Sequence, residues 1–154
     1  MIGFDKLRDL TRLRAAVWLA RLAAGGVFVY ASAHKILYPA AFARDIYNYQ
    51  LLPDAWINPL AIYLPWLELF CGLALISVRP LRRGAALLIG GMLAAFIVAI
   101  VSAMARGLDI RCGCFTSPGT HRLGWLNLAL DAALLPLTVL AARRSLPARP
   151  RAGG

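Results

Sequence analysis

Four long apolar runs limit what this chain can fold into. They cover residues 15–37, 57–78, 84–105 and 124–142, and each holds 19 to 23 residues. An α-helix rises about 1.5 Å per residue, so about 20 apolar residues are needed to cross the hydrocarbon core of a bilayer. The runs therefore predict an all-α, polytopic membrane protein folded as a bundle of four transmembrane helices.

The composition indicates that the chain contacts a lipid bilayer and does not bind a nucleic acid. The chain has 154 residues, of which 60% are hydrophobic, and its formal net charge is +10. Nucleic-acid-binding proteins gather their positive charge on one face or in a recognisable motif. Here the basic residues lie at the edges of the apolar runs, which is typical of membrane topology signals. Nucleic-acid binding is therefore not expected.

The segments outside the runs have distinct patterns. Residues 1–14 alternate apolar and charged side chains and predict an amphipathic lead-in on the cytoplasmic surface, while residues 143–154 form a basic cytoplasmic tail. In the link after the first run, Phe42, Ile46 and Tyr49 recur at helical spacing. This spacing predicts a short helix lying at the membrane interface.

The distribution of lysine and arginine predicts the orientation, because cytoplasmic loops carry the excess of positive residues. Eleven lie on the side of the termini, namely Lys6, Arg8, Arg12, Arg14, Arg79, Arg82, Arg83, Arg143, Arg144, Arg149 and Arg151. Five lie on the other side, namely Lys35, Arg44, Arg106, Arg111 and Arg122. We therefore expect both termini in the cytoplasm of a bacterial cell, with the chain in its inner membrane. The loop between the third and fourth runs then faces the oxidising extracytoplasmic side.

Charged residues inside the runs are candidates for function, because an unpaired charge in a membrane costs several kcal/mol. Arg21 and Glu68 are expected at similar depths, from their distances to the cytoplasmic ends of their runs. They are therefore predicted to form a buried pair, serving as a structural tie, as part of a proton path or as a polar anchor for a redox ligand. Asp131 lies nearer the outer face, within reach of Lys35.

Cys112 and Cys114 flank a single glycine in the stretch DIRCGCFTS, residues 109–117. A disulfide between them needs a sharp bend, which Gly113 permits, and the resulting bond should be strained. Strained, exposed disulfides are the labile or catalytic ones. The neighbouring Arg111 adds positive potential that favours a thiolate. The pair is therefore predicted to carry out thiol–disulfide exchange.

Two other uses of this loop stay open. Cys112, Cys114 and His121 could bind a thiophilic ion such as Cu(I) or Hg(II), which would make the chain a metal-binding or transport protein. The chain could also be a non-catalytic subunit that anchors a redox enzyme to the membrane.

Electron transfer from a thiol pair to the membrane would need an acceptor, because the chain has no second cysteine pair. By analogy with other four-helix thiol oxidases, a quinone bound among Trp66, Phe70 and Trp125 would serve.

The order of these features resembles the MauE/DoxX group of redox-associated, four-span membrane proteins. The shared stretches are the GG and HK of the first run, DIYNYQLLPD, LPWLELFCGLALI, ARGLDIRCGCF and the tryptophan-then-acid pattern from Trp125 to Asp131. The chain departs from the group at Thr116, where glycine is usual, and at Leu130, where arginine is common.

The resemblance implies a function in addition to the fold. The chain would work with a thioredoxin-like partner outside the membrane, as MauE does in quinone-cofactor maturation. Cys112 and Cys114 would be the redox pair, and Glu68 and Asp131 would be intramembrane acids of the kind found in the group.

Overall fold

The computed structural model describes residues 2–108 and 125–142, and the regular secondary structure of these residues is entirely helical, without β-strands. The elements are α1 (Ile2–Leu37), α2 (Pro39–Asn48), α3 (Asp54–Ser77), the short 3₁₀ helix η1 (Arg79–Leu81), α4 (Arg82–Ala105) and α5 (Trp125–Ala142). The prediction of an all-α protein is confirmed.

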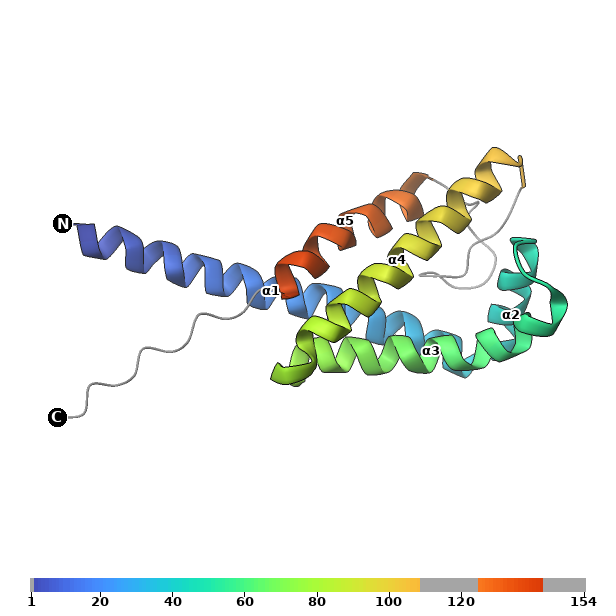
Figure 1. Ribbon diagram of the computed structural model, residues 1–154, viewed down its shortest axis with the longest axis horizontal. Helices are drawn as coiled ribbons and strands as arrows, with labels where there is room; N and C mark the ends of the chain where they lie inside the picture. The colour runs from blue at the N-terminus through green and yellow to red at the C-terminus, as the bar shows by residue number, and fades with distance from the viewer. Residues whose placement is uncertain (1, 109–124, 143–154) are drawn as a thin grey trace.

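The four long helices pack into one bundle, which Figure 1 shows from the side. α1 packs on α3 and on α5, and α4 packs on the same two helices from the other side. The short helix α2 packs on α3 and on the last part of α1, so it lies at the end of the bundle where α1 ends and α3 begins. α4 ends, and α5 begins, toward this same end.

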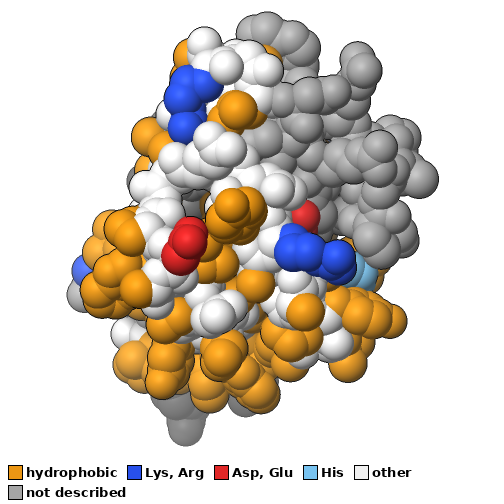
Figure 2. Space-filling model, turned by 90° about the vertical axis from the view of Figure 1, so that its right-hand side faces the viewer, with side chains coloured by type: hydrophobic (Ala, Val, Ile, Leu, Met, Phe, Trp, Pro, Cys, Tyr) orange, Lys and Arg blue, Asp and Glu red, His pale blue; other side chains and the backbone are white. Residues whose placement is uncertain are grey.

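Three of these segments are long and apolar enough to cross a membrane, namely Arg8–Leu37, Asp54–Ser77 and Arg79–Ala105. α5 forms within the fourth predicted run, where Leu128–Ala142 is a shorter apolar stretch. Large apolar side chains point outward from the bundle, including Tyr63, Leu87 and Val98, each more than 65% exposed. Figure 2 shows hydrophobic side chains over much of the described surface at the α2 end, with charged side chains in a few spots. Such a surface is expected of a protein that lies in lipid.

Three of the long helices, α1, α3 and α4, begin before the apolar runs that predicted them. α1 continues without a break from Ile2 through the predicted lead-in, so residues 2–14 form no separate helix. α3 and α4 begin two or three residues before the predicted positions 57 and 84. The predicted short helix is present as α2, with Phe42 on its buried side. Its place at a membrane interface remains a prediction.

Two glycines lie at a close contact between α1 and α3. A Cβ atom added to Gly72 would lie 2.9 Å from the carbonyl oxygen of Gly25 and 3.0 Å from a methyl carbon of Val29. A Cβ atom added to Gly25 would lie 2.6 Å from Ile76. Small residues allow this approach of two membrane helices. The contact fixes the register of the antiparallel pair, with Gly25 opposite Gly72.

We expect Gly72→Ala to destabilise the bundle by about 1–3 kcal/mol, because the added methyl group meets backbone atoms that cannot move aside cheaply. The matched control is Gly91→Ala on α4, where a Cβ atom would meet nothing within 4 Å. Thermal unfolding in detergent, followed by circular dichroism, compares the two. Equal unfolding midpoints for the two variants would contradict the close contact.

Gly107 ends α4. Its φ angle is +67°, a region that glycine enters without strain. The amide of Leu108 donates to the carbonyl of Ala103, and that of Gly107 donates to Met104, which is the hydrogen-bond pattern of a Schellman motif. The preceding Arg106 donates from its guanidinium to the carbonyl oxygens of Tyr49 and Gln50, just beyond α2. The chain therefore leaves α4 beside the end of α2.

Candidate functional site

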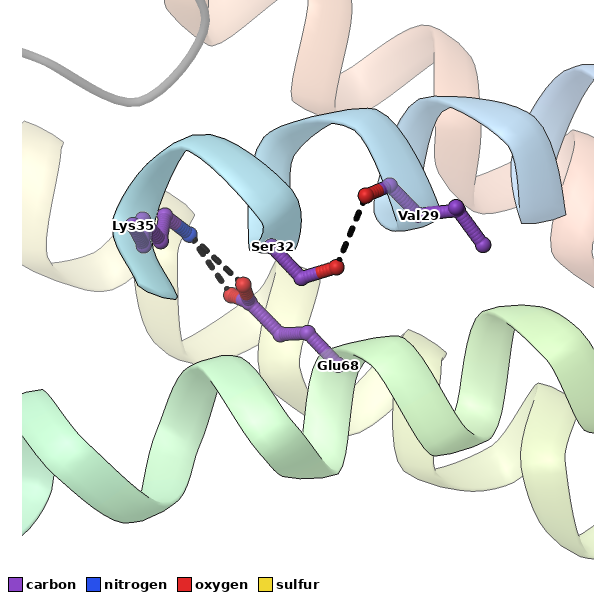
Figure 3. A network of polar contacts seen from close by, with 4 residues as sticks. All are labelled: Val29, Ser32, Lys35 and Glu68. Carbon is purple, nitrogen blue, oxygen red and sulfur yellow. Dashed lines mark hydrogen bonds and ion pairs between the residues drawn. The ribbon is translucent and has the colours of Figure 1, made fainter. Parts of the chain in front are cut away.

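A buried ion pair joins α1 to α3 (Figure 3). The Lys35 Nζ atom lies 2.7 Å from Oε1 and 2.8 Å from Oε2 of Glu68, so it donates to both carboxylate oxygens. The Lys35 side chain is 4% exposed and that of Glu68 is 1% exposed. Both charges are therefore removed from solvent and from lipid, and each depends on the other for compensation.

The directions of the two helices explain why these residues meet. In an α-helix the Cα–Cβ bonds tilt toward the N-terminus. Since α1 and α3 are antiparallel, Lys35 and Glu68 lean toward each other, as Figure 3 shows. The glycine register places Glu68 level with Val29, about 9 Å along α1 from Lys35. Two long side chains cover that distance.

The predicted pair between Arg21 and Glu68 is wrong. The same register places Arg21 opposite Ile76, about 12 Å along the helix from Glu68, and Arg21 leans away from it. Instead, Arg21 is 2% exposed and its Nε atom donates to the carbonyl oxygen of Ala141 over 2.9 Å. The last carbonyls of a helix lack partners within it and carry partial negative charge. Arg21 therefore ties α1 to the end of α5.

Two aromatic rings complete the surroundings of the Lys35 ammonium group. Its Nζ atom lies 4.8 Å from the ring centre of Phe42 on α2 and 5.0 Å from that of Phe96 on α4. A desolvated cation over an aromatic face gains about 2 kcal/mol. The sequence analysis singled out Phe42 only as part of an amphipathic helix, and it missed Phe96, which has no distinguishing neighbour in the sequence.

Asp131 of α5 is the third charged residue at this place. Together with Lys35 and Glu68 it lines a small cavity of about 10 Å³, closed by the apolar side chains Phe28, Ala31, Leu93 and Phe96. This agrees with the expectation that Asp131 lies near Lys35. Asp131 is 3% exposed, and its Oδ1 atom has no hydrogen-bond partner in the described part of the chain.

Ser32 lies next to the ion pair, but its hydroxyl group is hydrogen-bonded within its own helix. It is fully buried, and its hydroxyl donates to the carbonyl oxygen of Val29 on the same helix over 2.8 Å (Figure 3). Its proton is therefore used within α1 and not for the carboxylate of Glu68.

A second, larger cavity of about 300 Å³ lies between α2, α3 and α4. Its walls are almost entirely apolar, and Asp45 is the one acidic residue among the described residues that line it: Phe42, Asp45, Ile46, Tyr49, Leu51, Leu52, Leu60, Leu64, Met92, Ala95, Phe96 and Ala99. Phe96 lines both cavities, so its ring lies between this apolar space and the charged cluster.

The residues expected around a quinone are not gathered at either of these cavities. Trp66 and Phe70 lie on the outer side of α3, 48% and 66% exposed, and they line neither cavity. The side chain of Trp125 lies outside the described residues.

The predicted redox pair also lies outside the described residues. This holds for Cys112, Gly113 and Cys114, for the neighbouring Arg111, and for His121 of the alternative metal site. Within 8–108 and 128–142, Cys71 is buried as a free thiol, and no group of three or more His, Cys, Asp or Glu side chains is placed to hold a metal ion. Exchange chemistry and metal binding in the loop therefore stay predictions.

The fold and site define a helical membrane protein with a buried, charged cluster near one end of its bundle. The family model for methylamine utilisation protein MauE matches residues 13–144, and the chain belongs to this family.

Several curated proteins named methylamine utilization protein MauE are similar to this chain. The one from Paracoccus denitrificans is 31% identical over 133 residues, covering 86% of this chain and 70% of its own length. The one from Methylorubrum extorquens is 36% identical over 121 residues, covering 77% of this chain and 63% of its own length. The one from Methylophilus methylotrophus is 34% identical over 118 residues, covering 75% of this chain and 62% of its own length. The chain thus spans about two thirds of the length of these relatives, and no solved structure matches it.

Proposed function

We propose that this chain is an integral-membrane thiol–disulfide exchange protein, acting through Cys112 and Cys114 on a thioredoxin-like protein outside the membrane. The observation that carries the proposal is the end of α4. Gly107 stops the helix beside α2, so the segment with both cysteines starts at the bundle end that also holds the Lys35 cluster. Membership in the MauE family supports it, and the names of the relatives make methylamine utilisation the proposed setting.

The proposed topology has four spans, with α5 as the fourth and α2 at the outer interface. The eleven basic residues near the termini and the η1 link, against five at the other end, favour cytoplasmic termini in a bacterial inner membrane. In this orientation the cysteine loop meets the oxidising compartment, where disulfides persist.

The proposed exchange passes through a mixed disulfide. A thiolate of the reduced partner attacks one sulfur of the Cys112–Cys114 disulfide, so that bond breaks as an intermolecular one forms. The second thiolate of the partner then displaces the bound cysteine. The partner loses two electrons and gains a disulfide, while Cys112 and Cys114 become thiols.

A lipid-soluble quinone is the proposed acceptor that restores the loop disulfide. It takes two electrons and two protons from the two thiols and becomes a quinol. The apolar cavity between α2, α3 and α4 suits the ring better than the outward-facing Trp66 and Phe70, because its volume of about 300 Å³ is within the range of small-molecule sites. It also lies at the same end of the bundle as the start of the loop.

Trapping tests the proposed function. In Cys114→Ser and Cys112→Ser single variants, the remaining loop thiolate can attack the disulfide of an oxidised thioredoxin-like protein and release one of its cysteines as a thiolate. The second loop thiol that would resolve this mixed disulfide is absent, so we expect a covalent adduct. The adduct should appear on non-reducing gels, disappear with reductant, and be absent from the double variant. Cys71→Ala in each background is the matched control and should retain the adduct, because Cys71 is buried. Failure of both single variants to trap any protein would contradict exchange with a protein partner.

A further inference from the structure

The charges in the small cavity do not balance. Both oxygens of Glu68 accept from Lys35, so these two residues neutralise each other. Asp131 adds a second carboxyl group to the same cavity, and its Oδ1 atom has no partner in the described residues. If Asp131 were ionised, one net negative charge would stay buried in the bundle, at a cost of several kcal/mol.

No further cation among the described residues reaches this cavity. On α1, Arg21 lies about 21 Å along the helix from Lys35 and bonds to the far end of α5. The residues that α4 contributes are Leu93 and Phe96, and α3 contributes only Glu68. No residue of α2 is among the described residues that line this cavity. Asp45 of α2 lines the larger apolar cavity instead, and it would add negative charge and not remove it.

We propose that the cavity between Lys35, Glu68 and Asp131 is a proton-binding site, with the proton carried by Asp131 at neutral pH. A proton on this carboxyl group removes the unbalanced charge and leaves the ion pair intact. This inference concerns only the buried cluster, so it holds or fails independently of the cysteine loop.

The cavity also has room for the water molecule that would connect the proton to the ion pair. Its volume of about 10 Å³ is close to the minimum for one water, which needs two to four polar partners. An ammonium group has three N–H donors, and Lys35 uses two of them on Glu68. The third donor, together with the Oδ1 atom of Asp131, can hold a water. The resulting site binds a proton and one water within the membrane-embedded bundle.

Infrared spectroscopy of the purified protein in detergent at neutral pH tests this proposal. We expect the C=O stretching band of a protonated carboxylic acid, shifted to lower frequency in D₂O. The band should shift further when aspartate is labelled with ¹³C at its side-chain carboxyl carbon, and should not move with glutamate labelled in the same way. This measurement uses the wild-type chain and needs no variant. The absence of the band, or a band that responds only to glutamate labelling, overturns the proposal.

Two variants and a matched control sharpen the test. Asp131→Asn, which keeps the size of the side chain, should abolish the band, while Asp45→Asn on α2 should retain it. Lys35→Met leaves two acids without a cation, so both should bind protons and the band area should rise about twofold. A band that persists in Asp131→Asn, or an unchanged area in Lys35→Met, would place the proton elsewhere and refute the site.

Discussion

Lys35→Met is expected to destabilise the protein by about 3–5 kcal/mol, because Glu68 loses its buried partner and can then stay in the bundle only by taking up a proton at neutral pH, which is itself unfavourable. The double variant Lys35→Met/Glu68→Leu should lose much less stability, since no unpaired member of the ion pair remains. Glu68→Leu alone should be milder than Lys35→Met, because Asp131 in the same cavity can ionise and pair with Lys35. Unfolding of the three variants in detergent measures the coupling.

The control for these three variants is Arg44→Met on α2. Arg44 is exposed, so we expect this variant to change the free energy of unfolding by no more than about 0.5 kcal/mol. If the stability loss of the double variant equals the sum of the losses of the two single variants, Lys35 and Glu68 do not interact. Equal losses for the two single variants would show that Asp131 does not respond to the missing partner.

Substitution of either Cys112 or Cys114 by serine should abolish thiol–disulfide exchange, whereas Cys71→Ala should leave it nearly intact. A disulfide in such a tight ring should be more oxidising than structural disulfides, which lie below about −300 mV. Equilibration of the purified protein in glutathione buffers, followed by alkylation and mass measurement, counts the free thiols. We expect a transition within the glutathione range in the wild type and in Cys71→Ala.

Two results would count against this redox pair. A loop disulfide that resists reduction over the whole glutathione range would indicate a structural bond, and thiols that never oxidise would favour metal binding by Cys112, Cys114 and His121. Loss of exchange in Cys71→Ala equal to that in the loop variants would mean that the buried thiol takes part.

The long helices were predictable because hydropathy directly reflects the solvent that a helix faces. Their ends were less predictable, since hydrogen bonding continues past the point where the side chains stop being apolar. α1 shows this most clearly, because it runs on through the polar residues 2–14. The end of α4 is an exception, because Gly107 marks it with a residue type suited to a positive φ angle.

The residues of the charged site were found in the sequence, but their pairing was not. The position of a residue within an apolar run gives only the position of its Cα atom along the helix axis. The ammonium group of a lysine and the carboxylate group of a glutamate lie up to several ångströms from their Cα atoms. The direction in which side chains lean on antiparallel helices, and the register set by Gly25 and Gly72, favour Lys35 over Arg21 as the partner of Glu68. Phe96 could not be found in this way, because nothing in the sequence distinguishes it from other aromatic residues in apolar helices.

The hydrogen bonds of Arg106 link two parts of the molecule mechanically. Arg106 is the last residue before the glycine that ends α4, and it holds the carbonyl oxygens of Tyr49 and Gln50 at the end of α2. α2 is also a wall of the apolar cavity, through Phe42, Ile46 and Tyr49. The guanidinium group of Arg106 therefore fastens the last turn of α4 to a wall of this cavity.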